Sequence, residues 1–599
     1  MENNRNLFIT IILSVVILAA WQIFYIGPKI EAEKQAQLEI QAQQEPTATT
    51  SESTSLPQAT VNNSAVAPSE AASSEAQPEA GRVTIDTPTL TGSINLRGAR
   101  FDDLKLKDYR VTIAKDSDIV TLLRPSNEVD GYIGEFGYLG VDGAPSSDAV
   151  WQAPEGATLT PSSPVELTYT APNGIVFTRT VSVDENYMFQ IDDAVTNNSG
   201  GAVALQEYGR VTRYSKPAKP PIYVLHEGLI GVTGEDGLTE IKYNKIEDEG
   251  TVEVGKSTDG WLGITDKYWA TAMVPTGGES FQPRYSYFSE GRPRYQSDFL
   301  KDPVTINAGQ TVQFDNLFFA GAKISNLLDA YKETYDIRLF EKLIDWGWFF
   351  FITRPMFHLI DFLYNFFGNF GVAILVTTVI VKAVFFPLAN MSYASMARMK
   401  VMQPKMQELK EKYGDDREKM QKAMMELYKT EKINPVAGCW PMLIQIPVFF
   451  ALYKVLYITI EMRHAPFFGW IQDLSAPDPT HVFNLFGLLP YDPSAIPVIG
   501  TFLAIGVWPL LMGITMFLQM RMNPAPPDPT QAMIFNWMPL VFMFMLASFP
   551  AGLVIYWAWN NTLSIIQQGV IMKKNGAKIE LWDNLRGLFG RKKKADATE

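Results

Sequence analysis

Cysteine and histidine are scarce in this 599-residue chain. Its one cysteine, Cys439, excludes an intrachain disulfide and a cysteine-cluster metal site, because both need several thiols. The four histidines, His226, His358, His464 and His481, show no spacing typical of metal ligands. We therefore expect neither a metal site nor a cofactor.

Positive charge is also in deficit, with 51 Lys and Arg against 64 Asp and Glu and a net charge of −13. Residues 82–325 contain about 22 basic and 33 acidic residues, so nearly the whole acidic excess lies there. Proteins that bind nucleic acid carry clustered basic surfaces. The balance argues against DNA or RNA as a partner of this region.

Long apolar runs, in contrast, are abundant. The first, "LFITIILSVVILAAWQIFYIG" at 7–27, is long enough to cross a bilayer as a helix, and no small-residue cleavage site ends it. We expect residues 1–27 to be an uncleaved anchor. Five further predicted spans follow near residues 367–390, 438–460, 498–520, 533–549 and 551–572.

The distribution of Lys and Arg orients these six predicted spans, because basic residues crowd cytoplasmic loops. Segment 391–434 carries about ten of them, the tail 573–599 ends in a basic run, and loop 461–497 carries one. Both termini are therefore expected in the cytoplasm. The acidic region between the first two spans then lies in the periplasm, and the chain resides in a bacterial inner membrane.

The region outside the spans divides by composition. Residues 28–80 are poor in aromatics and rich in Gln, Ala, Ser and Pro, which predicts a flexible tether. Residues 81–325 contain short alternating stretches such as "VELTYT" and "IVFTRTVSV", broken by Gly, Asn and Pro. This pattern predicts one large antiparallel β-sandwich.

One motif in this domain imitates a nucleotide site. "GTVEVGKS" at 250–257 matches the phosphate-binding loop pattern, but that loop must follow a buried strand and open a helix. Here Val252 and Val254 alternate as in a strand, and no helical start follows. We therefore interpret this stretch as a β-hairpin that fits the pattern by chance.

We predict that residues 326–369 form an amphipathic helical region, which lies at the membrane–water interface on the periplasmic side. Many aromatics accompany Arg354, His358 and Asp361, which share one helix face at spacings of four and three residues. Packing of this helix against the β-domain is the alternative.

Segment 391–434 predicts a cytoplasmic helical hairpin turning at "YGDD". Methionines recur at helical spacing on both arms, and methionine suits surfaces that bind varied apolar partners. The same stripes could instead seal the two arms together. The residues concerned are Met399, Met402, Met406, Met420 and Met424.

A lysine, Lys382, interrupts the apolar run "TTVIVKAVFFPL" at 377–388. A lysine at the centre of a membrane helix costs roughly 2.5–3.5 kcal/mol. Two arrangements lower this cost. The side chain could extend to the inner interface, since the span ends near Pro387, or it could lie in a water-accessible groove. The other predicted spans offer no carboxylate near their centres.

Further polar positions favour the groove. Thr378 lies one turn before Lys382, and Gln445 interrupts the span 438–460. The last span carries a polar stripe, although each residue alone could be a contact between helices. The stripe consists of Trp557, Asn561, Ser564 and Gln568. Lys454 lies near the outer end of its span, where we expect it to extend to the interface.

Several long stretches, in this order, are similar to those of one family. They are "VIVKAVFFPL", "SYASMARMKVMQPKMQELKEKYGDD", "EKINPVAGCWPMLIQIPVFFALY", "APFFGWIQDLSAPDP" and "FPAGLVIYWAWNNTLSIIQQ". Together they resemble the YidC membrane-protein insertases in their long Gram-negative form. The resemblance covers nearly the whole chain and is densest over 370–570.

The resemblance implies a fold and a function. The fold is an α-helical polytopic membrane protein, in which residues 370–572 form a five-span core, with a periplasmic β-domain resembling the supersandwich of sugar mutarotases. The core would enclose a hydrophilic groove, open to the cytoplasm and to lipid, which takes up polar parts of a nascent membrane protein without ATP. The client's apolar segment would pass along the outer faces of 370–390 and 438–460. The implied partners are the bilayer, the Sec translocon and the ribosome.

Thr378 and Trp557 match groove positions of the family, and Cys439 matches a position at the cytoplasmic end of its span. Family members usually carry arginine where this chain has Lys382. Lysine keeps the positive charge and loses the planar fork that binds a carboxylate through two hydrogen bonds.

Two other classes of function compete with this interpretation. A secondary transporter could use an intramembrane lysine, although such proteins usually show internal repeats and broken helices. A membrane-bound enzyme would need clustered acid, base or nucleophile residues on the β-domain. We see no such constellation and predict that the chain is not an enzyme.

Overall fold

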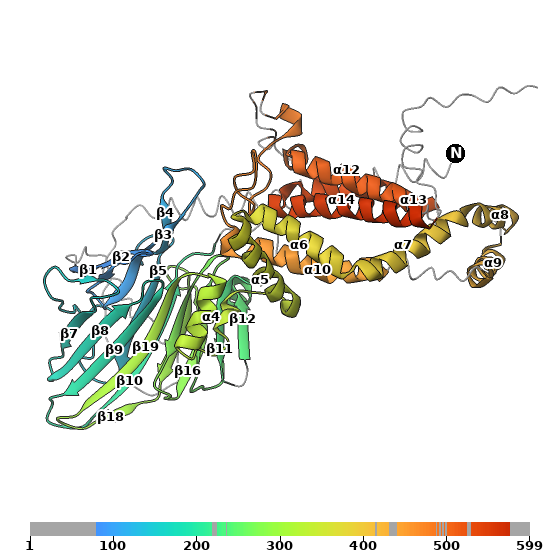
Figure 1. Cartoon of the computed structure of the whole chain (residues 1–599). Coiled ribbons are helices and arrows are strands. Elements are labelled where there is room, and N and C mark those ends of the chain that lie inside the picture. Colours follow the sequence, from blue (N-terminus) through green and yellow to red (C-terminus); the bar gives the residue numbers. More distant parts are fainter. Residues whose placement is uncertain are drawn as a thin grey trace, which may run out of the picture. The chain divides into compact units, whose positions relative to one another are not determined.

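The computed structural model describes residues 80–217, 225–234, 237–413, 416–430, 440–486, 488–489, 491, 493, 496, 500–523 and 529–575. The predicted anchor, the tether, Cys439 and most of the basic tail lie outside these residues. The described part contains a β-domain, a short helical connection and a group of apolar helices (Figure 1).

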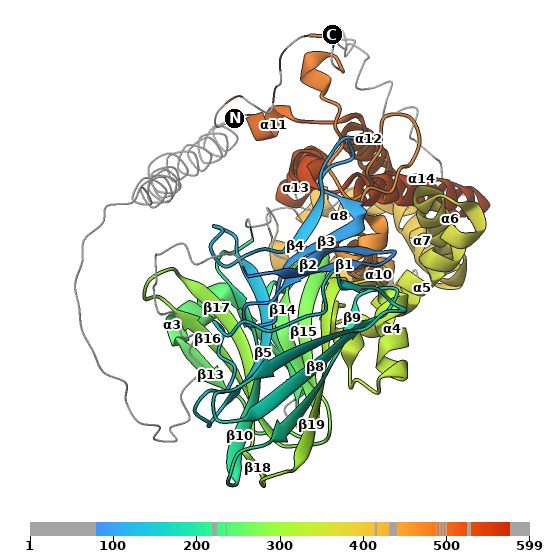
Figure 2. The ribbon, with the colours of Figure 1, turned by 90° about the vertical axis from the view of Figure 1, so that its left-hand side faces the viewer.

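Two sheets form the β-domain, as the alternating pattern predicts (Figure 2). The eight-stranded sheet has the order β12-β11-β14-β15-β19-β9-β8-β7. Its strands are β12 (Gly237–Lys242), β11 (Gly228–Thr233), β14 (Gly260–Thr265), β15 (Trp269–Pro275), β19 (Thr311–Ala322), β9 (Met188–Asn197), β8 (Ile175–Val183) and β7 (Val165–Thr170).

The second sheet has eleven strands, with the main order β13-β16-β17-β10-β5-β3-β2-β1-β6, while β18 pairs with β10 and β4 with β3. Its strands are β13 (Thr251–Glu253), β16 (Phe281–Phe288), β17 (Arg294–Lys301), β10 (Val203–Arg213), β5 (Tyr132–Leu139), β3 (Arg100–Arg110), β2 (Leu90–Asn95), β1 (Arg82–Asp86), β6 (Thr158–Leu159), β18 (Val304–Ile306) and β4 (Ile119–Leu123). The named strand pairs are antiparallel apart from β1 and β6, which run parallel.

Aromatic side chains fill the space between the sheets. Phe101 of the larger sheet lies 5.1 Å from Phe189 and 5.2 Å from Phe318 of the smaller one, measured between ring centroids. Phe136 contacts Phe318 as well, at 6.0 Å. Gly134 is required here, because a Cβ at this position would lie 2.5 Å from Cζ of Phe318. These contacts between phenylalanine rings of the two sheets pack the two layers against each other.

The nucleotide-like stretch 250–257 is part of this domain. Helix α3 (Tyr243–Glu249) precedes it, β13 occupies its first half, and β13 pairs with β16. Lys256 forms an ion pair with Asp302 at 2.5 Å. The stretch is therefore a strand and a turn without a following helix, as its alternation predicts.

The connection to the apolar helices contains α4 (Ser325–Thr334), the short 3₁₀ turn η2 (Phe340–Leu343) and α5 (Phe350–Phe367). The charged face of α5 contacts α4, where Arg354 binds Asp329 at 2.7 Å and Asp361 accepts a hydrogen bond from Asn326 at 3.1 Å. Phe362 and Phe366 on α5 are exposed. Two of the three polar residues predicted to share this face, Arg354 and Asp361, thus form a helix–helix contact, and the third, His358, is exposed.

The C-terminal helices lie in the predicted apolar runs, except that α8, α9 and most of α7 lie in the predicted hairpin segment 391–434. They are α6 (Phe370–Val384), α7 (Phe386–Val401), α8 (Gln403–Tyr413), α9 (Arg417–Thr430), α10 (Trp440–Ile458), α11 (Gly500–Leu503), α12 (Val507–Met522), α13 (Pro529–Met545) and α14 (Ala551–Lys574). Short 3₁₀ turns accompany them: η4 (Ile460–Met462), η5 (Val482–Asn484) and η7 (Leu546–Ser548).

Two predicted spans are interrupted. In run 367–390, helix α6 ends at Val384, and α7 follows it at an angle of 69°. Run 498–520 contains a break at 504–506, between α11 and α12. Among the described residues, no single helix combines the length and the apolar composition needed to cross a bilayer, whereas α6 and α7 meet this criterion as a bent pair.

Candidate functional site

Lys382 lies two residues before the end of α6, next to the bend. The helix begins at a well-formed cap, because the Asn369 side chain accepts a hydrogen bond from the Val372 N–H. The Lys382 ammonium is half-buried and donates a hydrogen bond to Oγ of Ser564 on α14, at 2.6 Å. The side chain therefore points at a neighbouring helix rather than extending along its own helix to an interface.

Within the part of the chain that the structure describes, Lys382 forms no ion pair with a carboxylate. An isolated buried cation is unfavourable unless polar groups or water surround it. Ser564 supplies one acceptor for an ammonium that has three donors. The charge is thus held at the bend, with donors left to serve water or an acidic ligand.

A small cavity of about 10 Å³ lies beside the ammonium. This volume has room for roughly one water molecule, so it is much narrower than the groove that the sequence predicts. Three helices contribute most of its lining, and α5 adds one residue. The lining consists of Met356, Thr377, Thr378, Val381, Lys382, Val448, Leu452, Tyr556 and Asn560.

The polar stripe on α14 is mostly buried between helices. Asn561 donates to Thr515 Oγ1 at 3.4 Å, and Gln568 donates to Asn523 Oδ1 at 3.0 Å, both toward α12. Ser564 receives the Lys382 hydrogen bond and donates to the Asn560 carbonyl at 2.8 Å. The stripe thus joins α14 to α12 on one side and to α6 on the other. These are the contacts between helices that we gave as the alternative to a groove for each polar residue.

Trp557 and Thr378 occupy different surroundings. The Trp557 ring is half-buried between Phe449 of α10, 4.6 Å away, and Phe542 of α13, 5.5 Å away. Thr378 is buried and donates to the Ile374 carbonyl of its own helix at 2.7 Å. Thr378 also lines the cavity next to Lys382, whereas Trp557 closes the space between α10 and α13.

Gln445 lies in α10, but its side chain is outside the described residues. Lys454 of the same helix corrects our expectation of a side chain that extends to the interface. It is 8% exposed, and its ammonium lies 2.8 Å from Oδ2 of Asp345. The partner lies 109 positions earlier in the chain, so helical spacing could not reveal it.

The site contains three further polar residues that the sequence analysis did not identify. Asn560 lines the cavity, and Thr515 and Asn523 accept the hydrogen bonds from the polar stripe of α14. Thr515 and Asn523 are eight positions apart on the run from 507 onward. Two polar residues at helical spacing in an apolar run were therefore a usable signal.

The predicted methionines are partly or fully buried, three of them on the hairpin formed by α8 and α9 and two at the end of α7. Met402 is 8% exposed, and Met406, Met420 and Met424 are half-buried, as is Met399 on α7. This distribution fits the sealing alternative. Met425, one position beyond the predicted stripe, is 55% exposed and is the hairpin's free methionine surface among the described residues.

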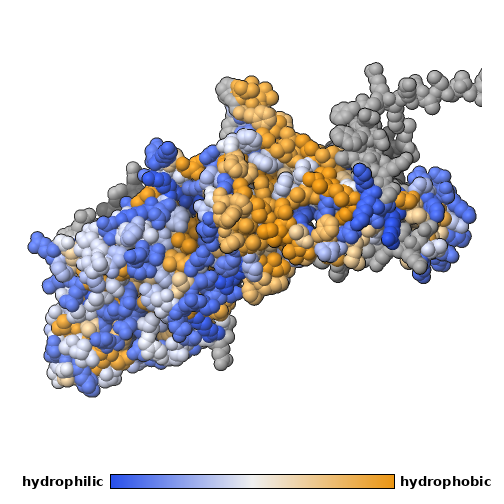
Figure 3. Space-filling view, in the orientation of Figure 1, coloured by the Kyte–Doolittle hydropathy of each residue, from blue (hydrophilic) through white to orange (hydrophobic). Residues whose placement is uncertain are grey.

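Large apolar side chains are exposed beside the Lys382 site. Val379 and Ile380 project from α6, and Ile446 and Phe450 from α10. Figure 3 shows hydrophobic residues covering much of the surface of the apolar helices. Apolar surface of this extent marks contact with lipid or with an apolar partner.

Comparison with known proteins decides the family. Residues 82–359 match the model described as "YidC periplasmic domain", and residues 362–578 match the model described as "60Kd inner membrane protein". The chain is 60% identical over 597 residues to the membrane protein insertase YidC of Rhizobium meliloti (strain 1021), covering 99% of this chain and 100% of the relative. The chain belongs to the YidC membrane protein insertase family.

Other YidC insertases are similarly close. The protein of Rhizobium etli (strain CIAT 652) is 60% identical over 601 residues, and that of Brucella suis biovar 1 (strain 1330) is 58% identical over 613 residues. Each alignment covers 99% of both chains. The predicted resemblance is thereby confirmed, as are the two-sheet β-domain followed by C-terminal helices and the insertase class. The transporter alternative gains no support.

Proposed function

We propose that this chain inserts integral membrane proteins into a bacterial inner membrane and assists their folding. The observation that carries the proposal is the full-length identity of 58–60% with proteins named membrane protein insertases. Lys382, a cation at a helix bend without a carboxylate partner among the described residues, supplies a site suited to this function.

The topology we propose has six spans. Residues 7–27 form the first, and the helices over 370–572 form the five-span core. In this arrangement the termini and the hairpin of 391–434 face the cytoplasm, and residues 81–325 face the periplasm at the end of the tether 28–80. The region 326–369 lies in the outer interface, and 573–599 forms a basic cytoplasmic tail. The supporting observation is the crowding of Lys and Arg in 391–434 and in the tail.

The apolar segment and the polar flank of a client differ in how easily they enter the membrane. Moving about 20 apolar residues from water to lipid is favourable by tenths of a kcal/mol per residue. The barrier lies in the polar flank, whose charges and peptide groups must cross hydrocarbon. A hydrated, positively charged position inside the membrane shortens that crossing and lowers the barrier for an acidic flank. Insertion by this route needs no ATP.

The groove in this proposal widens when a client enters. The small cavity beside Lys382 is its resting form, and Thr378, Asn561, Ser564 and Gln568 supply polar surface when α14 separates from α6 and α12. Gln445 and Trp557 belong to the same groove in our assignment. The client's apolar segment passes along the exposed apolar faces of α6 and α10.

We also assign partners. Nascent membrane proteins are the clients, and the Sec translocon is a partner for clients with large translocated regions. The basic tail and the hairpin suit contact with ribosomal RNA, because both carry clustered Lys and Arg. Nothing in the arrangement of the β-domain residues leads us to propose enzymatic activity.

Reconstitution tests the function. Purified protein in liposomes should insert a single-span client, measured as protease protection of its translocated flank, while empty liposomes should not. The same vesicles should take up no small solute, which separates an insertase from a transporter. Equal protection in empty liposomes would contradict the proposal.

A further inference from the structure

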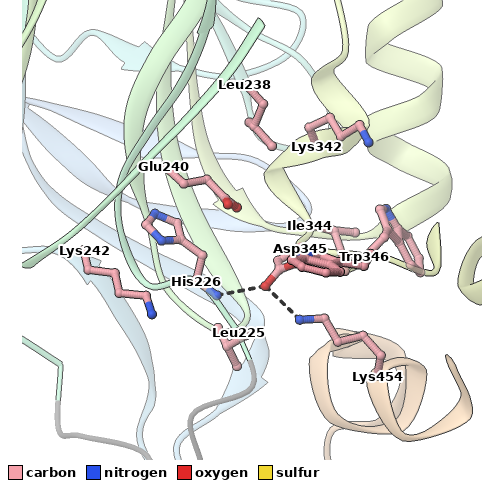
Figure 4. Close-up of a pocket in the computed structure, with 12 residues that line it drawn as sticks. Leu225, His226, Leu238, Glu240, Lys242, Lys342, Ile344, Asp345, Trp346 and Lys454 are labelled. Atoms are coloured by element: carbon pink, nitrogen blue, oxygen red, sulfur yellow. Dashed lines mark hydrogen bonds and ion pairs between the residues drawn. The ribbon is translucent and has the colours of Figure 1, made fainter. Parts of the chain in front are cut away.

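A second, larger cavity lies apart from the Lys382 site. Its volume is about 480 Å³, and β12, the segment 342–348 and Lys454 of α10 form its walls (Figure 4). Three lysines and two carboxylates are among its twelve lining residues, and the insertion mechanism uses none of them.

Strand β12 supplies one wall. It is one of the two edge strands of the eight-stranded sheet, so no strand among the described residues pairs with its outer side. Side chains two positions apart project to the same face of a strand. Leu238, Glu240 and Lys242 are exposed and line the cavity, whereas Ile241 between them is buried.

Asp345 holds the opposite walls together. Its Oδ2 accepts hydrogen bonds from the His226 N–H at 2.9 Å and from the Lys454 ammonium at 2.8 Å, and its Oδ1 accepts one from the Gly347 N–H at 3.0 Å. Burial opposes ionisation, but Lys454 and these hydrogen bonds hold the pKa of Asp345 below its ordinary value. Asp345 is therefore a saturated structural carboxylate, and it fixes the shape of the cavity.

Three charged side chains remain for a ligand. Lys242 and Lys342 form no ion pair within the described residues, and the Lys342 ammonium lies 4.5 Å from the centroid of the Phe350 ring. Burial and the neighbouring Asp345 raise the pKa of Glu240, and Lys454, Lys242 and Lys342 oppose this rise. All three line the cavity, and in Figure 4 Lys242 and Lys342 extend from opposite sides of Glu240. This set complements a ligand that carries an anionic and a cationic group close together.

An exposed aromatic side chain lines the cavity. Trp348 is 94% exposed, and three positions along the chain Phe351, in the first turn of α5, is 63% exposed. In membrane proteins, tryptophan side chains are enriched at the level of the lipid headgroups. Lys454, on the floor of the cavity, belongs to the apolar helix α10. The lining of the cavity thus combines charged side chains with an exposed tryptophan ring.

We propose that this cavity binds the phosphoethanolamine headgroup of a membrane phospholipid. Lys242 and Lys342 bind the phosphate, Glu240 accepts hydrogen bonds from the primary ammonium, and the acyl chains leave past Trp348 and Phe351. The proposal rests on the membrane placement given under "Proposed function". A choline headgroup carries no N–H donor for Glu240, and a glycerol headgroup offers only neutral hydroxyl donors.

Lipid titration of the full chain in detergent, followed by native mass spectrometry, tests the proposal. The wild type should bind phosphatidylethanolamine about tenfold more tightly than phosphatidylcholine, with phosphatidylglycerol between them. Lys242→Ala combined with Lys342→Ala should weaken binding of all three lipids by roughly tenfold or more. Glu240→Gln should bring ethanolamine and choline lipids to equal affinity.

The charge-matched control is Lys245→Ala with Lys256→Ala, which removes two exposed lysines of surface ion pairs and should leave lipid binding unchanged. Equal affinity of the wild type for ethanolamine and choline lipids would overturn the proposal. So would unchanged binding in the Lys242 and Lys342 variant, provided that its thermal melting shows an intact fold.

Soluble glycerophosphoethanolamine distinguishes a lipid from a free phosphate ester. Binding as tight as that of the intact lipid would overturn the lipid assignment. Client insertion by the same preparation is measured separately. Retained ethanolamine preference without insertion would contradict the proposed function alone, and insertion without any preference would contradict the lipid site alone.

Discussion

At the scale of single residues, buried charges are the main feature of the β-domain. Arg179 and Asp193 form a double hydrogen bond, Nε to Oδ1 at 2.8 Å and Nη2 to Oδ2 at 2.7 Å, and both are buried. Tyr138 donates to the same carboxylate at 2.5 Å. Removing one partner of such a pair leaves an uncompensated charge in the core.

Asp193→Ala should therefore destabilise the β-domain by about 3–5 kcal/mol. The matched control is Asp302→Ala, which breaks an exposed pair with Lys256 and should cost no more than about 1 kcal/mol. Urea unfolding of the detergent-solubilised protein, followed by tryptophan fluorescence, measures both. Equal losses in the two variants would show that burial does not govern these ion pairs.

Glu461, just beyond the end of α10, predicts a pH dependence. Its Oε1 accepts the Ser325 N–H at 3.1 Å, and burial raises its pKa to about 7 from the ordinary value of 4.5, with Asp361 adding to the effect. Since the folded state binds this proton more tightly than the unfolded state, the stabilisation is complete below pH 4.5 and is lost as the pH rises through 7.

Glu461→Gln keeps a neutral side chain at every pH. The melting temperature of the wild type should therefore fall relative to that of the variant between pH 5 and pH 8. Melting curves of the two proteins across this range make the comparison. Parallel pH profiles would mean that Glu461 ionises in the folded protein as it does in the unfolded chain.

Sequence reasoning identified Lys382 and Lys454 as unusual, because each charge interrupts an apolar run. It could not name their partners. Ser564 lies 182 positions from Lys382, and Asp345 lies 109 positions from Lys454. Side-chain contacts over such separations follow from the tertiary arrangement of helices rather than from periodicity along one helix.

At the scale of elements, the hairpin of α8 and α9 is the clearest case of two uses for one residue type. Met406, Met420 and Met424 are half-buried, while Met425 is exposed. Flexible, unbranched methionine packs well between helices and also adapts to varied apolar surfaces.

Met420→Ala should loosen the hairpin, because it removes apolar surface that is half-buried there, whereas Met425→Ala removes an exposed side chain and should not. Limited proteolysis of the purified protein should cut the first variant several times faster than the wild type and the second at the wild-type rate. Crosslinking of a client to the hairpin should decline for Met425→Ala. The opposite assignment of these two effects would refute the distinction between packing and contact methionines.

Periodicity and length located the helices well, because an apolar run needs little context to be recognised. It did not predict the interruption at Phe385 or the break at 504–506. Both lie within continuous apolar stretches. Hydropathy averages over a window, so it detects the presence of a run and not the angle between its halves.

At the scale of the whole molecule, the proposed topology places the β-domain and the hairpin on opposite sides of the membrane. The one cysteine makes this testable, because a Cys439→Ser background carries no thiol. Ser163→Cys reports on the exposed surface of the β-domain, and Glu418→Cys reports on α9, where its side chain is 80% exposed.

In spheroplasts, a membrane-impermeant maleimide should label the Ser163→Cys protein and should label the Glu418→Cys protein only after lysis. The reason is the excess of Lys and Arg around the hairpin, which directs it to the cytoplasm. Labelling of both positions in intact spheroplasts would contradict the orientation.

The central claim is that this chain inserts membrane proteins with the help of the charge on Lys382. The most direct test compares wild type, Lys382→Arg and Lys382→Met in liposomes, with single-span clients whose flanks are acidic or neutral. We predict that the wild type and Lys382→Arg insert acidic-flank clients and that Lys382→Met loses most of this activity, while neutral-flank clients differ little. Equal insertion of acidic-flank clients by all three proteins would contradict the account.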